Sequence, residues 1–234
     1  MDVIGLLPRL HLLRFPVGQA YLWRDDDALT LIDAGTIGAG RAIADAVRAL
    51  GHAPGDVRRI VLTHFHEDHV GGAGEFAALS GAEVLAHPLD APFVRGELPG
   101  PHPRFEDWEL PIHAAAAKLL PDGTPMPPAS VTGVSDGDVL GFGGGARVIH
   151  VPGHTDGSIA LFLPEERVLF TGDTVAASPV DGSVLPGVFN LDRPQLLASL
   201  VRLAELDADV ACFGHGDPVV GGAAAALREV ARAR

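Results

Sequence analysis

Cysteine is almost absent from this chain of 234 residues, which contains one thiol, at Cys212. A single cysteine cannot form an intrachain disulfide, so the sequence excludes a fold held together by disulfide bonds. No uninterrupted apolar run approaches the roughly 20 residues that a membrane-spanning helix needs. The first residues also lack the basic start and the small-residue cleavage site of a secretory signal. These absences predict a cytoplasmic protein that has no membrane partner.

Basic residues are scarce too: the chain has 17 lysines and arginines against 30 acidic residues, a formal net charge of −13. A strongly negative protein repels the phosphate backbone of nucleic acids, so we expect a small-molecule substrate and no nucleic-acid partner. Apolar residues make up 47% of the chain, as in an ordinary globular protein with a sizeable core. We expect one domain over residues 1–234. The sequence does not indicate an oligomeric state.

Strand and helix patterns alternate along most of the chain. We predict strands at residues 20–23, 28–32, 59–63 and 82–86, with helices at 37–50 and 71–80. Short strands at 139–140, 147–151, 158–163 and 168–171 predict an antiparallel meander, and helices at 193–205 and 222–234 flank a last strand at 210–213. Two successive sets of strands followed by helices predict an α/β protein with two sheets packed face to face and helices outside.

The middle of the chain, at about residues 88–130, has a different composition. It carries ten prolines, and only the stretch 105–120 could hold one or two helices. We interpret the segment as a surface excursion of the single domain, because long irregular segments often form lids or pocket walls. Its part Phe93–Pro128 is expected to form a wall of the substrate pocket.

Four side chains that can bind a metal lie within six residues, in the motif His64-Phe65-His66-Glu67-Asp68-His69. His64 and His66 are two residues apart on a chain that leaves a predicted strand, so both can point the same way. Such a cluster is hard to explain by packing. Imidazole and carboxylate ligands suit zinc, and also iron and manganese.

Three further candidates, His154, Asp173 and His215, each follow a predicted strand and adjoin a glycine. Glycine lets the backbone turn sharply beside a ligand, and strand ends gathered at one sheet edge can converge on one point. Ligand histidines usually donate their other ring N–H to a nearby acceptor. Asp33, after the strand at 28–32, is a candidate for that acceptor, and Glu67 is expected either to face solvent or to serve in the same way.

The set of motifs, His64-x-His66-x-Asp68-His69 followed by Gly-His154, Gly-Asp173 and Gly-His215, resembles the metallo-β-lactamase superfamily. The resemblance covers residues 20–215 and implies an αββα sandwich of two mixed β-sheets with helices on both outer faces. It also implies two divalent metal ions, zinc first, with iron or manganese as alternatives. His64, His66 and His154 would hold one ion, Asp68, His69 and His215 the other, and Asp173 would bridge them. Asp68 and Asp173 are the catalytic candidates, beside a hydroxide shared by the metals that attacks the substrate carbonyl.

Asp173 also favours a branch of that superfamily. True β-lactamases with two zincs lack a bridging aspartate at this position, so Asp173 resembles the glyoxalase II-like and lactonase-like branches, which cleave activated esters. Two features depart from these relatives. The sequence after His215 lacks the helical domain of glyoxalase II, and residues 174–177 lack the tyrosine of the homoserine lactonases. We therefore predict a thioester or lactone hydrolase, with two alternatives: a persulfide dioxygenase-like oxidoreductase that binds one iron, and a phosphodiesterase.

Overall fold

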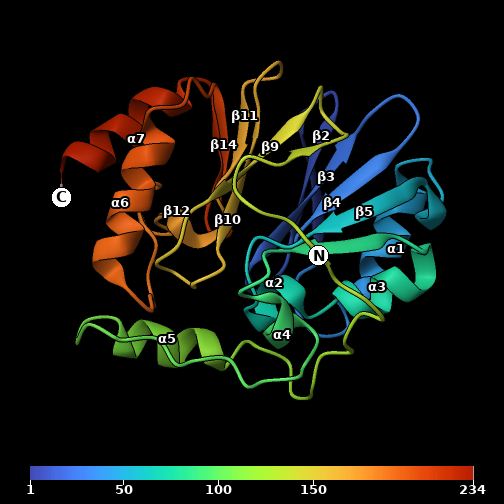
Figure 1. Cartoon of the computed structure of the whole chain (residues 1–234), viewed down its shortest axis with the longest axis horizontal. Coiled ribbons are helices and arrows are strands. Elements are labelled where there is room, and N and C mark those ends of the chain that lie inside the picture. The colour runs from blue at the N-terminus through green and yellow to red at the C-terminus, as the bar shows by residue number, and fades with distance from the viewer. Residues whose placement is uncertain (234) are drawn as a thin grey trace. The chain divides into compact units, whose positions relative to one another are not determined.

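The computed structural model describes residues 1–233, which divide into two compact units, each described here by itself (Figure 1). Unit 1 comprises residues 1–100 and 114–134, and unit 2 comprises residues 101–113 and the chain from residue 135 onward. Each unit has its own mixed sheet and its own helices. The α/β class with two mixed sheets is therefore confirmed, and the single domain over residues 1–234 stays a prediction.

Unit 1 is built on a seven-stranded sheet whose strands follow one another in chain order. The first four strands pair antiparallel, and the pairs from β4 to β7 are parallel. Because parallel strands end at the same edge of a sheet, the loops that follow β4, β5 and β6 lie near one another. The strands are β1 (Asp2–Leu7), β2 (Leu10–Arg14), β3 (Gln19–Arg24), β4 (Leu29–Ile32), β5 (Val57–Val61), β6 (Glu83–Ala86) and β7 (Thr132–Gly133).

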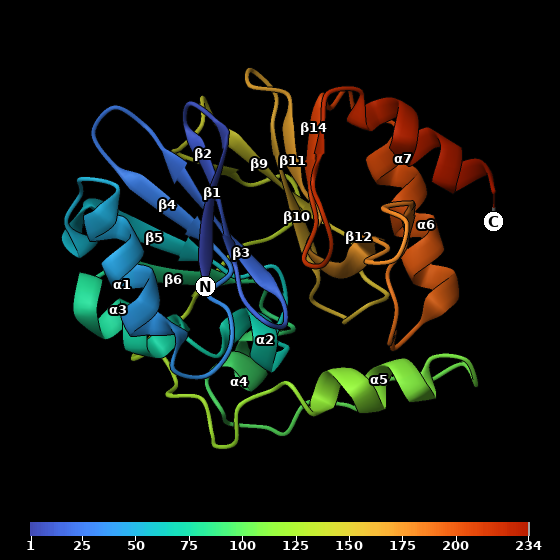
Figure 2. The ribbon, with the colours of Figure 1, turned by 180° about the vertical axis from the view of Figure 1, so that it is seen from behind.

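The helices α1 (Ala39–Ala49) and α3 (Ala73–Ser80) lie along this sheet, as both ribbon views show (Figures 1 and 2). Ile43 and Val47 of α1 share a buried core with Phe76 of α3 and Ile60 of β5. This apolar face is the one that the 3.6-residue spacing predicts. The shorter elements of unit 1 are a 3₁₀ turn at Pro54–Asp56, α2 (Glu67–Val70) and α4 (Ala91–Val94).

Unit 2 carries a six-stranded sheet in the order β15-β14-β11-β10-β9-β8. Strands β8 to β11 form the antiparallel meander that the sequence predicts, and β11 pairs parallel with β14. A two-stranded ribbon follows from β12 and β13. The bounds are β8 (Val139–Leu140), β9 (Ala146–His150), β10 (Ile159–Leu163), β11 (Val168–Phe170), a 3₁₀ turn at Gly172–Thr174, β12 (Val175–Ala177), β13 (Val184–Pro186), β14 (Val210–Cys212) and β15 (Val219–Val220).

The helices α6 (Arg193–Ala204) and α7 (Ala223–Arg232) lie side by side on unit 2 (Figure 2). Leu200 of α6 and Leu227 of α7 share one buried core with Leu169 of the sheet. Asp192 caps α6 by accepting a hydrogen bond from the backbone N–H of Gln195 at 2.9 Å. Residue 234, the last of the predicted closing helix, lies outside the described residues.

The proline-rich middle segment contributes to both units, with residues 101–113 in unit 2 and its remainder in unit 1. It forms one eight-residue helix besides the four-residue α4, namely α5 (Leu110–Ala117), inside the predicted stretch 105–120. Within residues 1–233 no helix is long and apolar enough to cross a membrane. The proposed role of Phe93–Pro128 as a pocket wall stays a prediction.

Candidate metal centre

The histidine motif of unit 1 begins in the loop after β5, where the chain leaves the carboxyl edge of the parallel strands, and continues into α2. His66 is extended and starts α2, so Asp68 and His69 are carried on that short helix. The rings of His64 and His66 lie 4.7 Å apart, and those of His64 and His69 lie 4.1 Å apart. His69 Nε2 is 3.7 Å from Asp68 Oδ2. Local structure thus gathers the four predicted donors of this motif.

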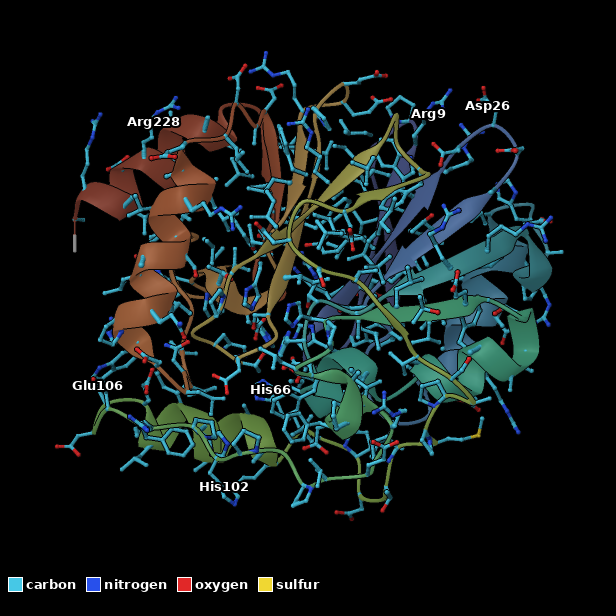
Figure 3. All side chains as sticks on the ribbon, in the orientation of Figure 1. Arg9, Asp26, His66, His102, Glu106 and Arg228 are labelled. Atoms are coloured by element: carbon cyan, nitrogen blue, oxygen red, sulfur yellow. The ribbon has the colours of Figure 1, made fainter. Side chains whose placement is uncertain are left out.

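Figure 3 labels His66 at the end of unit 1 opposite to Arg9 and Asp26, which form an ion pair of 2.8 Å. His64 and His69 are buried, Asp68 is partly buried, and Glu67 is exposed. Partial burial, and then the neighbouring Asp68 carboxylate, raise the pKa of Glu67. Since its side chain is exposed, Glu67 faces solvent, which is one of the two roles that the sequence predicts for it.

Asp33 organises two of these histidines from the end of β4. Its Oδ1 accepts the backbone N–H of Thr63 at 2.7 Å, and its Oδ2 accepts the Thr63 hydroxyl at 2.8 Å and lies 2.9 Å from His69 Nδ1. Because the Thr63 hydroxyl donates to Asp33, it accepts from His64 Nδ1, which lies 3.0 Å away. The predicted acceptor role of Asp33 is confirmed for His69 directly and extends to His64 through Thr63. Both rings are thereby held as Nδ1–H tautomers.

The backbone around Asp33 explains the precision of this arrangement. Asp33 itself has a positive φ of 59°, a conformation that aspartate and asparagine tolerate better than most residues. The N–H of Ala34 donates to the carbonyl of His69 at 2.7 Å, which joins the two loops directly. Gly72 approaches so closely that a Cβ there would lie 2.4 Å from the Ala34 carbonyl oxygen. The glycine after the motif is required for this close packing.

The three donors of unit 2 come from three loops at one sheet edge. His154 follows β9, Asp173 lies in the 3₁₀ turn after β11, and His215 follows β14. Strands β11 and β14 are parallel neighbours, so the latter two loops emerge side by side, and Gly214 N–H donates to the Gly172 carbonyl at 3.0 Å. Asp173 Oδ2 lies 3.4 Å from His154 Nε2 and 3.2 Å from His215 Nε2. The predicted bridging aspartate therefore stands between the two histidines of its unit.

Asn190 is a functional candidate that sequence reasoning missed. Its side-chain N–H donates to the Gly187 carbonyl at 2.9 Å, which identifies Oδ1 as the atom that lies 3.3 Å from His154 Nδ1. Since an amide oxygen only accepts, His154 also carries its ring proton on Nδ1. The separation of 36 residues carries no spacing signal, so Asn190 could be recognised only from the folded chain.

These residues fit a metal site by the chemistry of their donors. In His64, His69 and His154 a protein acceptor takes the Nδ1–H, so Nε2 is the atom that presents a lone pair to a cation. Carboxylates stand close to Nε2 of two of them, at Asp68 and Asp173. Nitrogen and oxygen donors of this kind suit zinc, iron and manganese. Four donors belong to unit 1 and three to unit 2.

Comparison with known proteins gives the family. A model described as the metallo-beta-lactamase superfamily matches residues 13–215. The probable metallo-hydrolase YqjP of Bacillus subtilis (strain 168) is 29% identical over 231 residues, which cover 88% of this chain and 69% of that protein. A hydroxyacylglutathione hydrolase of Cereibacter sphaeroides is 31% identical over 199 residues, covering 82% of this chain and 62% of its own. The crystal structure of a metallo-beta-lactamase family protein from Thermus thermophilus matches with a TM-score of 0.68 and 31% identity, over 98% of this chain and 79% of the other. The chain belongs to the metallo-beta-lactamase superfamily, as the sequence predicts.

Proposed function

We propose that the protein is a metal-dependent hydrolase that cleaves an activated ester, either a thioester or a lactone. The observation that carries the proposal is that the Nδ1 atoms of His64, His69 and His154 each face a protein acceptor, on Thr63, Asp33 and Asn190 respectively, which implies a common Nδ1–H tautomer. Such acceptors are the usual partners of metal-binding imidazoles. A buried histidine that served only packing would not need its Nε2 directed at neighbouring carboxylates.

The assignment of individual ligands follows the family. By that assignment His64, His66 and His154 would hold one divalent ion, Asp68, His69 and His215 would hold a second, and Asp173 would be shared by both. We propose zinc as the metal, with iron or manganese as the alternatives. When bound, the ions supply a nucleophilic hydroxide near neutral pH and polarise the carbonyl of the substrate.

The protein's own groups have three tasks in this reaction. Asp33 and Asn190 keep the imidazole rings in one orientation and one tautomer. Asp173 holds its carboxylate between two histidines, where its negative charge favours cations. Where the second ion is absent or weakly bound, Asp68, whose Oδ2 lies 3.7 Å from His69 Nε2, would instead take up the proton of the attacking water and pass it to the leaving group.

An activated ester fits the remaining chemistry of the chain. Cys212 is fully buried in β14, and burial raises the pKa of its thiol well above the ordinary value, so a thiolate nucleophile is disfavoured. A thioester or lactone has a good leaving group and needs little help from a general acid. The named substrate of one relative, hydroxyacylglutathione, is itself a thioester. The net charge of −13 disfavours phosphodiesters.

The test is a comparison of rates at matched metal loading. Zinc- and manganese-loaded protein is assayed on thioesters, lactones and bis-aryl phosphodiesters, with the metal content measured on the same samples. We expect two ions per chain and the highest kcat/KM on a thioester or a lactone. A tenfold preference for phosphodiesters, about 1.4 kcal/mol in barrier, would overturn the ester assignment, and one iron per chain would favour the dioxygenase alternative.

Two further results complete this test. The Cys212→Ala variant is the matched control, and we expect it to keep the activity of the wild type because the thiol takes no part. The cytoplasmic location predicted from the sequence belongs to the same proposal, and cell fractionation checks it.

A further inference from the structure

Glu109 is a buried carboxylate in the middle segment, with 1% of its surface exposed. Its Oε2 accepts the backbone N–H of Glu106 at 2.9 Å, and the N–H of Glu109 donates back to the Glu106 carbonyl at 2.9 Å. This reciprocal pair fixes the turn that leads into α5. Its Oε1 accepts the backbone N–H of Phe189, which is 80 residues away in the chain, at 3.1 Å. A buried charge that joins two distant loops needs a reason, because desolvating a carboxylate is costly.

The loop at Phe189, to which Glu109 is hydrogen-bonded, has an unusual backbone conformation. Phe189 has a positive φ of 59°, which costs free energy in a residue with a bulky side chain. Three other contacts from the same segment support this loop. The Phe189 ring packs against Phe105 at 5.9 Å and against His113 at 5.2 Å between ring centroids. Arg104 N–H donates to the carbonyl of Asn190 at 2.9 Å.

The residue directly after this strained position is Asn190, whose Oδ1 faces His154 Nδ1 at 3.3 Å. Asn190 is buried, and its amide is held on the other side by the Gly187 carbonyl. The direction of the Asn190 side chain therefore depends on the backbone turn at Phe189. All of these residues belong to unit 2.

We propose that Glu109 is a positioning residue for the metal ligand His154. Its carboxylate holds the left-handed turn at Phe189, the turn aims Asn190, and Asn190 fixes the orientation and the Nδ1–H tautomer of His154. The middle segment thereby sets the geometry of a ligand on another loop. This inference rests on the proposed function, because it takes His154 as a metal ligand.

The experiment compares four variants of the full chain. Glu109→Met removes both acceptors and keeps the volume, Asn190→Ala removes the group next to His154, and the double variant combines them. Glu106→Ala is the matched control, because the Glu106 side chain is exposed (Figure 3). The hydrogen bond between Glu109 and Glu106 uses the backbone N–H of Glu106, which this variant keeps. Zinc affinity is measured by competition with a chromophoric chelator, and thermal unfolding is followed on the metal-free proteins.

We expect Asn190→Ala and Glu109→Met each to weaken zinc binding by about tenfold or more, and the control to stay within about twofold of wild type. Because Glu109 acts through Asn190, the double variant should bind zinc no more weakly than Asn190→Ala alone. A role in stability alone would lower the unfolding temperature and leave the affinity of the folded protein unchanged. Additive losses in the double variant, or an unchanged affinity in Glu109→Met, would overturn the proposal.

A second measurement does not depend on metal. Nitrogen NMR of the histidine rings in the metal-free chain reports the tautomer of His154, which should lose its fixed Nδ1–H in Glu109→Met. If that variant does not fold, Glu109→Gln replaces it, and zinc affinity must then follow the hydrogen-exchange protection of the Phe189 amide. A variant that loses zinc affinity but keeps the protection of the Phe189 amide, or the reverse, contradicts the proposal. A wild-type chain that binds none of zinc, iron and manganese overturns the proposed function, whereas an unchanged His154 tautomer in Glu109→Met with intact zinc binding overturns the role of Glu109 alone.

Discussion

Replacing Asp33 by asparagine tests the tautomer argument with the smallest change in shape. Asparagine tolerates the positive φ of 59° at this position, so the backbone should stay as it is. One oxygen becomes an NH₂ group, which cannot accept from His69 Nδ1 or from the Thr63 hydroxyl. The hydroxyl can rotate, but the imidazole must either lose its partner or move its proton to Nε2. A ring protonated on Nε2 cannot offer that atom to a metal.

The magnitude follows from the hydrogen bonds that are lost. Asp33 makes three, at 2.7, 2.8 and 2.9 Å, and is 2% exposed. Asparagine keeps one acceptor, and hydrogen bonds to charged groups contribute about 1.5–3 kcal/mol each. Two bonds are lost, so we expect the metal-free protein to lose about 3–6 kcal/mol of the roughly 5–15 kcal/mol of unfolding free energy that domains typically have. Zinc affinity should fall by about 10- to 100-fold.

Urea unfolding of the metal-free protein and chelator competition measure the two effects separately. Asp27→Asn is the matched control, since it removes the same charge from an exposed turn of unit 1. We expect this control to change neither quantity beyond about 0.5 kcal/mol or twofold. If Asp33→Asn keeps the zinc affinity of the wild type and its His69 ring keeps the Nδ1–H tautomer, the reasoning from Asp33 to the metal site is wrong.

Three further predictions address unit 2. Replacing Asp173 by alanine should lower metal content and hydrolysis rate together, and a fully loaded, fully active variant would contradict a dinuclear centre. Gly187→Ala should destabilise the protein by about 3 kcal/mol in urea unfolding, because its Cβ would lie 1.7 Å from the Asp173 carbonyl oxygen. Gly141→Ala meets nothing within 4 Å and should be neutral, so equal effects at the two glycines would refute this explanation. The hydrogen bond from Arg202, more than any other contact, lowers the pKa of Asp136 in the folded protein. The pair therefore stabilises the fold fully above the unfolded-state pKa of about 3.9. This stabilisation is lost as the pH falls through the lower pKa of the folded state. Because both side chains are about half exposed, Asp136→Asn should cost about 0.5 kcal/mol at pH 7 and progressively less as the pH falls below about 3.9, and a cost that is independent of pH would exclude the ion pair as its cause.

The strongly patterned elements could be predicted from the sequence. The helix expected at residues 37–50 is observed at Ala39–Ala49, because its apolar spacing and the glycine after it are local signals. The strands β1 and β2 were missed. The residues of β1 are exposed or only partly buried, so no alternation marks them, and the strand forms because it pairs antiparallel with β2. The ribbon of β12 and β13 was missed for a similar reason, since its three-residue strands depend on each other.

The candidate donors were accessible to sequence reasoning because each stands beside a glycine or within the histidine motif, at the end of a strand pattern. Asp33 could be proposed because it too follows a strand pattern. Asn190 and Glu109 could not, since their roles come from hydrogen bonds that span 36 and 80 residues. Contacts of this kind exist only after the sheets and loops have folded, and neither the residue types nor their spacing in the sequence predicts them.

The pairing of β6 with β7 has a consequence for how this chain could change. The middle segment leaves the sheet at Ala86 and returns at Thr132, on neighbouring strands in register. Its ends are therefore held together whatever its length, and doubling a flexible loop costs only about 0.6 kcal/mol of closure entropy. The link from Glu109 to Phe189 divides the segment into two arms. Insertions in either arm thus cost little free energy, whereas a shift of register at Glu109 would change the orientation of His154. The segment therefore combines a length that can change at low cost with one fixed point, at Glu109.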